Sequence, residues 1–285
     1  MSVESQILEA ILRWPDDERL RRAYADRCND RDRREFIRLQ SDLADAALSG
    51  FEAPLDWELR EENLLEKHER SWAEPVAELA DSYRFHRGFV ELVGLLARTF
   101  LDEAENLFSA SPIRHLDLFD GKDTLTDLLS MARLEQVRSL SLDRSGLEDH
   151  EIAALAESRW LRNLVWLSLS YNRITRNGVE ALVHSPYLVN LRYVDFDGNP
   201  FDPTERMAQD QGVVTDIWLP PDGIVLEERV GHRVSWLHRD AATFRGQVLG
   251  RFELADLAAR EQAQTLAEVQ ALAEARSVAS LDYAR

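Results

Sequence analysis

Apolar residues recur at a fixed spacing through the middle of the chain. The two best-matched segments are Leu164, Leu167, Leu169, Asn172 and Ile174, then Leu191, Val194, Phe196, Asn199 and Phe201. Each position has moved by 27 residues (191 − 164), and a segment beginning at Val137 stands in the same frame (164 − 137 = 27). Earlier segments begin at Ile113 and Val90, at intervals of 24 (137 − 113) and 23 (113 − 90). The pattern predicts short strands, each followed by a turn and a short helix.

The motif within each segment, L-x-x-L-x-L-x-x-N-x-L, is similar to that of leucine-rich repeats, whose periods cover this range. Such units fold by stacking and present an extended concave face. The sequence therefore predicts an α+β fold, a leucine-rich-repeat solenoid of about five repeats. We expect a helical N-terminal domain over 1–86, repeats over 87–203, a C-terminal cap over 204–240 and a helical tail over 241–285.

The two ends of the chain carry helical patterns. Near the start, apolar positions at helical spacing are Ile7, Leu8, Ile11 and Leu12. The tail over 241–285 is rich in Ala, Glu, Gln and Leu and contains no proline, which predicts one or two helices. Two roles are open for this tail: packing on the cap, or binding as a free helix in a partner's groove.

Several short strings resemble a known family. They are Ala10-Ile11-Leu12, Pro15-Asp16-Asp17, Tyr24-Ala25-Asp26, Arg34-Glu35-Phe36-Ile37-Arg38-Leu39-Gln40 and Arg87-Gly88-Phe89-Val90-Glu91. Over roughly residues 5–240 the chain resembles bacterial proteins in which a repeat-companion domain stands beside leucine-rich repeats. The resemblance implies this architecture and a bacterial source, and it implies no established activity. Arg27 departs from the family pattern, which often has an aromatic residue there.

Composition bounds the class of protein. Of 285 residues, 45% are hydrophobic and 30% charged, which suffices for a core and a polar surface. The chain contains no run of about eighteen apolar residues, so we expect no membrane span. The N-terminus lacks the pattern of a secretory signal. The single cysteine, Cys28, leaves no internal disulfide or Cys-rich zinc site. We therefore expect a reducing compartment, most simply the cytoplasm.

The charge balance limits the classes of molecule that the protein is expected to bind. With 34 basic and 52 acidic residues the net charge is −18, which opposes binding to nucleic acid and to anionic membranes. A basic protein partner fits this charge, although solubility alone also explains it. We expect another protein as the partner, with no nucleic acid and no membrane.

Side chains that flank the strand leucines are expected on the concave side, because alternate residues of a strand face opposite ways. The predicted partner-binding residues are His115, Asp117, Phe119, Asp143, Trp166, Ser168, Tyr171, Tyr193 and Asp195. Trp and Tyr are preferred interface anchors, and neighbouring Asp residues favour Arg or Lys on a partner. The alternative is that the N-terminal helices or the tail cover this face.

Catalytic chemistry finds little support in the sequence. Asp117 and Asp195 could form an acid–base pair, but carboxylates on an open face stay hydrated. The histidines show no metal-binding spacing, and no phosphate loop or nucleophile motif occurs. Neighbouring arginines could lower the pKa of Cys28, although a small buried apolar residue is the simpler interpretation. Asn172 and Asn199 are expected to hold the turns that leave the strands.

The sequence thus favours a non-catalytic protein–protein interaction module, an adaptor or regulatory subunit that binds its partner on the concave face. We expect no catalytic residues, no cofactor and no metal. One alternative is a structural subunit of a larger bacterial assembly, docking through the N-terminal helices or the C-terminal tail. The other is a hydrolase that uses concave carboxylates.

Overall fold

The computed structural model describes residues 2–49, 51–200, 251–264 and 267, together with five short strands between 215 and 249. Those strands are β7 (Thr215–Trp218), β8 (Gly223–Glu228), β9 (Val234–His238), β10 (Ala242–Phe244) and β11 (Gln247–Leu249). Most of the expected cap over 204–240 and the end of the tail over 268–285 lie outside the described residues.

Helices make up most of the N-terminal part. They are α1 (Val3–Arg13), α2 (Glu18–Arg27), α3 (Arg31–Ser49), α4 (Leu55–Ala73) and α5 (Val76–Leu79). Side chains of Ser2 and Asp17 accept hydrogen bonds from the first turns of α1 and α2, which satisfies backbone donors there. Strand β1 (Ser82–His86) follows, so the sheet begins before the expected boundary at residue 86.

Five short strands lie side by side in parallel. They are β2 (Phe89–Leu96), β3 (His115–Phe119), β4 (Ser139–Ser141), β5 (Trp166–Ser168) and β6 (Tyr193–Asp195). Their register follows the apolar spacing, since Leu140 pairs with Leu167 and Leu167 with Val194. Strand β1 pairs antiparallel with β2, and β9, β8 and β7 extend the sheet beyond β6.

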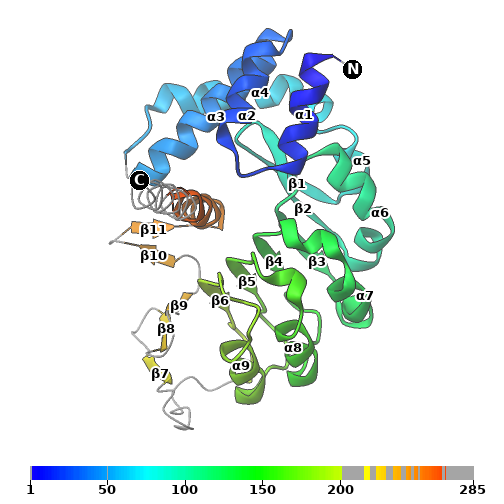
Figure 1. Ribbon diagram of the computed structural model, residues 1–285, viewed down its shortest axis with the longest axis vertical. Coiled ribbons are helices and arrows are strands. Elements are labelled where there is room, and N and C mark those ends of the chain that lie inside the picture. The colour runs from blue at the N-terminus through cyan, green and yellow to red at the C-terminus, as the bar shows by residue number, and fades with distance from the viewer. Residues whose placement is uncertain are drawn as a thin grey trace, which may run out of the picture.

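The segments between parallel strands cover one face of the sheet. They contain α6 (Ala97–Ala110), α7 (Leu125–Ser130), α8 (Asp149–Ala156), α9 (Arg176–Val183) and the 3-10 turns η1 (Lys122–Thr124), η2 (Ala132–Gln136) and η3 (Arg159–Leu161). Figure 1 shows these helices along one side of the strands. The main core lies between the two layers, with Leu116, Leu140 and Leu167 fully buried.

The prediction of a leucine-rich-repeat solenoid is wrong. Strands β1–β9 belong to one mixed sheet, bordered by antiparallel β1 and continued by antiparallel β8 and β7. The connecting segments are not copies of one unit, because a 14-residue helix follows β2 whereas a six-residue helix between 3-10 turns follows β3. Apolar spacing determines where each strand enters the sheet but does not make the connections equivalent. The fold is α+β, built on one large mixed sheet.

Two asparagines, buried Asn172 and partly buried Asn199, hold the turns after β5 and β6, as the sequence predicts. The Asn172 amide nitrogen donates to the carbonyls of Leu142 and Leu169, and its oxygen accepts from the Leu147 backbone N–H. Asn199 repeats the arrangement one strand later, accepting from the Ile174 N–H. The asparagines therefore satisfy backbone groups that the short strands leave unpaired.

A second layer lies on the other face of the sheet. Residues 251–264 form a helix, drawn in orange on the opposite side of the strands from α8 and α9 (Figure 1). The expected helical tail is thus helical in this part, whereas β10 and β11 pair as a short antiparallel hairpin before it. Within the described ranges no helix combines the length and apolar character needed to cross a membrane.

We expect Asn172→Ala to lower the free energy of unfolding by about 2–4 kcal/mol, because it strands several buried backbone groups. Urea-induced unfolding monitored by circular dichroism measures the change. The matched control is Asn190→Ala, since the Asn190 side chain makes one exposed bond to the Arg162 carbonyl and is expected to cost less than about 1 kcal/mol. Equal losses for the two variants would contradict the role assigned to Asn172.

Candidate functional site

One column of side chains runs across the face of the sheet opposite the main core. We call this column the covered face; it comprises Leu92, His115, Ser139, Trp166 and Tyr193, which pair in register from β2 to β6. The rings of Trp166 and Tyr193 stack with their centroids 3.6 Å apart. All five residues are buried.

The helix over 251–264 is what covers these rings. Leu254 and Ala258 form a small apolar cluster with Val165, Trp166 and Tyr193, separate from the main core. At the start of the helix, Phe252 stacks on His86 and meets His115 edge-on, with centroids 4.6 and 4.4 Å apart. The sheet therefore has two apolar layers of unequal size, one on each face.

This arrangement corrects the expected open concave patch. Trp166, Tyr193, His115 and Ser168 are buried, so they do not form a free docking surface. The physical reason is that stacked aromatic rings on a sheet face remove apolar area from water when a helix packs on them. Coverage by the chain's own tail, the alternative considered from the sequence, is the arrangement found.

A row of five residues, four of them charged, lies beside the covered face, one residue earlier in each strand segment. We call it the charged row: Glu91, Arg114, Arg138, Val165 and Arg192. Backbone hydrogen bonds of 2.8–2.9 Å join successive members, from the N–H of each to the carbonyl of the one before. Three members of this row are arginines with acidic or amide partners on the layers above.

The charged row holds both covering layers. Arg114 and Arg138 each form an ion pair with Asp16, in the turn between α1 and α2. Arg138 also donates to the Gln262 side chain at 2.9 Å, and Arg192 pairs with Glu261. Burial alone would raise the pKa of Asp16, but the charges of Arg114 and Arg138 outweigh it and lower that pKa.

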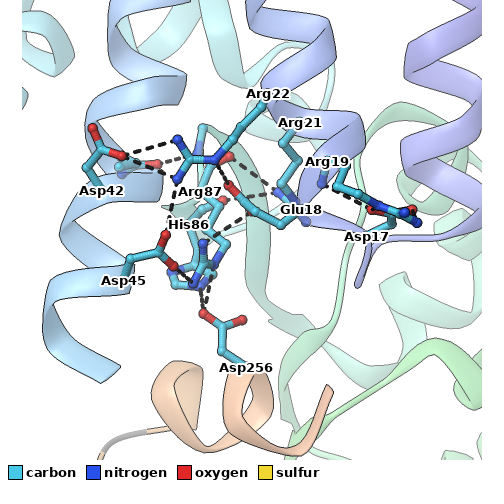
Figure 2. Close-up of polar contacts among 12 residues, drawn as sticks. Asp17, Glu18, Arg19, Arg21, Arg22, Asp42, Asp45, His86, Arg87 and Asp256 are labelled. Carbon is cyan, nitrogen blue, oxygen red and sulfur yellow. Dashed lines mark hydrogen bonds and ion pairs between the residues drawn. The ribbon is translucent and has the colours of Figure 1, made fainter. Parts of the chain in front are cut away.

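A second cluster fastens the helix near the β1–β2 turn. Figure 2 shows Asp256 pointing from the helix toward His86 and Arg87, with Asp45 of α3 approaching Arg87 from the other side. Asp256 Oδ2 lies 2.8 Å from Arg87 Nε and 3.0 Å from His86 Nε2. Burial by itself would raise the pKa of Asp256, but the His86 hydrogen bond and the Arg87 charge hold it well below its ordinary value.

Beneath this cluster lies a fully buried ion pair. Arg21 Nη2 is 2.5 Å from Glu91 Oε1, and both side chains are almost completely inaccessible. His115 Nε2 is 3.9 Å from Glu91 Oε2. Burial lowers the pKa of His115 well below its usual range, and Arg114 adds to the shift, so the imidazole is neutral at pH 7 and forms no ion pair there. These groups are sealed from substrates, which favours a structural role.

Three polar atoms of the covered face are buried without a protein hydrogen-bond partner in the described part of the chain. They are His115 Nδ1, Ser139 Oγ and Trp166 Nε1. Burying such an atom without a partner costs about 1–3 kcal/mol. The apolar contacts made by the helix are therefore partly offset by the polar groups that it seals.

A different set of side chains remains exposed where the parallel strands end. We call Leu96, Phe119 and Tyr171 the apolar rim; their exposed fractions are 48%, 47% and 52%. Leu96 and Phe119 are paired neighbours at the ends of β2 and β3. Tyr171 follows β5 in the left-handed region at φ 56°, and the Arg144 guanidinium lies 4.6 Å from its ring centroid.

Carboxylates surround the rim, and most already have contacts within the chain. Asp143 Oδ1 accepts from the Ser168 hydroxyl and the Ser170 N–H, which holds the end of β5. Asp117 pairs with Arg251 at 2.6 Å. Burial raises the pKa of Asp195, and the nearby carboxylates Asp143 and Asp197 add to the shift. The predicted site residues therefore separate into covered, structurally engaged and exposed groups.

The described residues contain no group of three or more His, Cys, Asp or Glu side chains arranged to hold a metal ion. Cys28 is buried, and burial raises the pKa of its thiol, contrary to activation by the neighbouring arginines.

Sequence reasoning missed the charged row, although a signal for it was present. The position immediately before His115, Ser139 and Tyr193 is arginine in each case, at the same place in the strand frame. An arginine that recurs next to the apolar strand positions indicates acidic side chains, from other segments, that pack against the start of the strands. The partner positions, Asp16 and Glu261, are far away in the sequence and follow no such frame.

No family model matches the chain, and no curated protein and no solved structure matches it either. The resemblance to repeat-companion proteins stays a prediction.

We expect Asp256→Asn to lower the free energy of unfolding by about 1–3 kcal/mol at pH 7. The pKa of Asp256 is depressed in the folded state, so its contribution is present above its ordinary value of 3.8 and is lost as the pH falls below it. Urea unfolding at pH 7 and pH 3 should show a smaller loss on acidification for the variant than for the native chain. Asp26→Asn, which breaks an exposed ion pair with Arg38, controls for the loss of one charge. An unchanged pH dependence in Asp256→Asn would exclude this linkage.

Proposed function

We propose that this protein is a protein-binding module, an adaptor or regulatory subunit of the bacterial cytoplasm that carries no chemistry of its own. The observation that supports the proposal is the apolar rim. Leu96, Phe119 and Tyr171 stay about half exposed at or just beyond the ends of β2, β3 and β5, strands whose other large apolar side chains are buried.

The rim has the character of an interface anchor. Aromatic side chains at the centre of interfaces contribute a large share of binding energy, because they bury much apolar area with few rotatable bonds. Phe119 and Tyr171 stand on rigid positions: Phe119 ends a strand, and the turn before Tyr171 is fixed by Asn172. The backbone that carries these rings is therefore already ordered, so little backbone entropy is lost on binding.

The charge near the rim favours a basic partner. Asp120 is exposed directly after Phe119, Asp143 is partly exposed two residues beyond β4, and Asp195 is partly exposed at the end of β6. Together with the net charge of −18, these carboxylates favour Arg or Lys around the partner's apolar contact. The same balance disfavours nucleic acid, whose phosphates require an excess of Lys and Arg.

Affinity purification from the source cell tests the proposal. We expect the double variant Phe119→Ser/Tyr171→Ser to lose a partner that co-purifies with the native chain, because the rim's apolar anchors are removed. Quantitative mass spectrometry should show at least about a tenfold depletion, the equivalent of roughly 1.4 kcal/mol of binding energy.

The matched control is Tyr187→Ser/Val189→Ser, which changes exposed apolar residues in the segment between α9 and β6. This variant should retain the partner. Equal recovery with the native chain and both variants would contradict binding at the rim. Loss only on removal of residues 251–285 would instead favour a structural subunit that docks through its tail.

A further inference from the structure

The helix over 251–264 occupies the covered face in the way that a bound peptide occupies a receptor. It contributes Leu254 and Ala258 to a cluster with Trp166 and Tyr193 that is separate from the main core. Removing the helix from this face would therefore leave the main core between the sheet and α6–α9 closed.

Charged contacts fix the direction and register of the helix on the face. Arg251 pairs with Asp117 on β3, Asp256 pairs with Arg87, and Glu261 pairs with Arg192. These three helix positions are five residues apart (256 − 251 = 5; 261 − 256 = 5). The face therefore recognises a helix with a cation in its first turn and carboxylates five and ten residues later.

Some contacts between the helix and the covered face are unfavourable or weak, which favours replacement of the helix by another one. Trp166 Nε1 and Ser139 Oγ have no protein partner in the described part of the chain, so their burial under the helix is costly. The Arg251–Asp117 and Arg192–Glu261 pairs are partly exposed to solvent, which weakens them. A partner helix that supplies a polar group to Trp166 or Ser139 would form a hydrogen bond that the chain's own helix does not make.

A cleft runs beside the second half of the helix. It has a volume of about 1250 Å³, and its lining includes Ala259 and Ala263 of the helix together with Trp14 and Arg133. The helix is therefore packed on the sheet along one side and open along another, so an incoming segment can approach the face without crossing the main core.

We propose that the covered face is a second protein-binding site, occupied at rest by the chain's own helix and taken over by an amphipathic helix of a partner. The partner helix would carry the same chemistry: an arginine, an apolar residue three positions later, a carboxylate at five and a small residue at seven. The partner helix can bind only those molecules in which the chain's own helix has left the face. The apparent affinity for the partner is therefore reduced in proportion to that fraction. This surface is distinct from the apolar rim of the proposed function.

A charge-complementation experiment on the full-length chain tests the proposal. The probe is a fluorescein-labelled peptide of residues 251–264, and fluorescence anisotropy measures its binding to the native chain and to Asp256→Ala. The substitution weakens the resident helix and leaves His86 and Arg87 without their carboxylate, which the peptide can restore. We expect the peptide to bind the variant at least about tenfold more tightly than the native chain.

Matched peptides and variants distinguish specific binding at the covered face from nonspecific peptide binding. A peptide that itself carries Asp256→Ala should lose most of this gain, and Asp26→Ala in the full-length chain should produce none. Should Asp256→Ala fail to fold, Glu261→Gln weakens the partly exposed pair with Arg192 and is expected to give a smaller gain of the same sign.

Binding of neither chain, or equal binding of both chains and both peptides, would overturn the proposal. Adding Phe119→Ser/Tyr171→Ser to the Asp256→Ala chain should leave peptide binding unchanged. A failure at the covered face can therefore be distinguished from a failure at the rim.

Discussion

The structure depends on a sheet that has apolar side chains on both faces. One face is sealed by α6–α9, which follow the strands directly in the chain and bury the strand leucines. The other carries the stacked pair Trp166 and Tyr193, which also requires cover. The connections between the strands lie on the first face, and a segment distant in the sequence, the helix over 251–264, covers the second.

Charged pairs, in addition to apolar contacts, join the α1–α2 turn and the helix over 251–264 to the sheet. The charged row meets Asp16 from the α1–α2 turn and Glu261 from the C-terminal helix, and Arg87 meets Asp45 of α3 and Asp256 of that helix. Breaking a buried pair of this kind is costly because it leaves an uncompensated charge. The network thus specifies where each layer sits, while the small cluster beneath the helix supplies limited apolar stabilisation.

The sequence predicts the strands, their register and the turn asparagines well, because those depend on neighbouring residues in one frame. Leu140, Leu167 and Val194 pair as their spacing indicates, and Asn172 bonds as expected. The solenoid was wrong because spacing does not determine the connections. Exposure of Trp166 and Tyr193 was wrong because Leu254, 61 residues beyond Tyr193 (254 − 193), covers them, and an amphipathic pattern does not identify the surface on which a helix packs.

Hydrogen exchange of the full-length chain, followed by mass spectrometry, tests most directly whether the covering helix is a separable layer. The account predicts that amides of 251–264 exchange by local opening, at least about tenfold faster than amides of β3–β5, with the strands still protected. It also predicts that Asp256→Ala accelerates exchange in the helix, while β3–β5 still exchange more slowly than the helix. Exchange of the helix and the strands at one common rate, through global unfolding, would contradict the account.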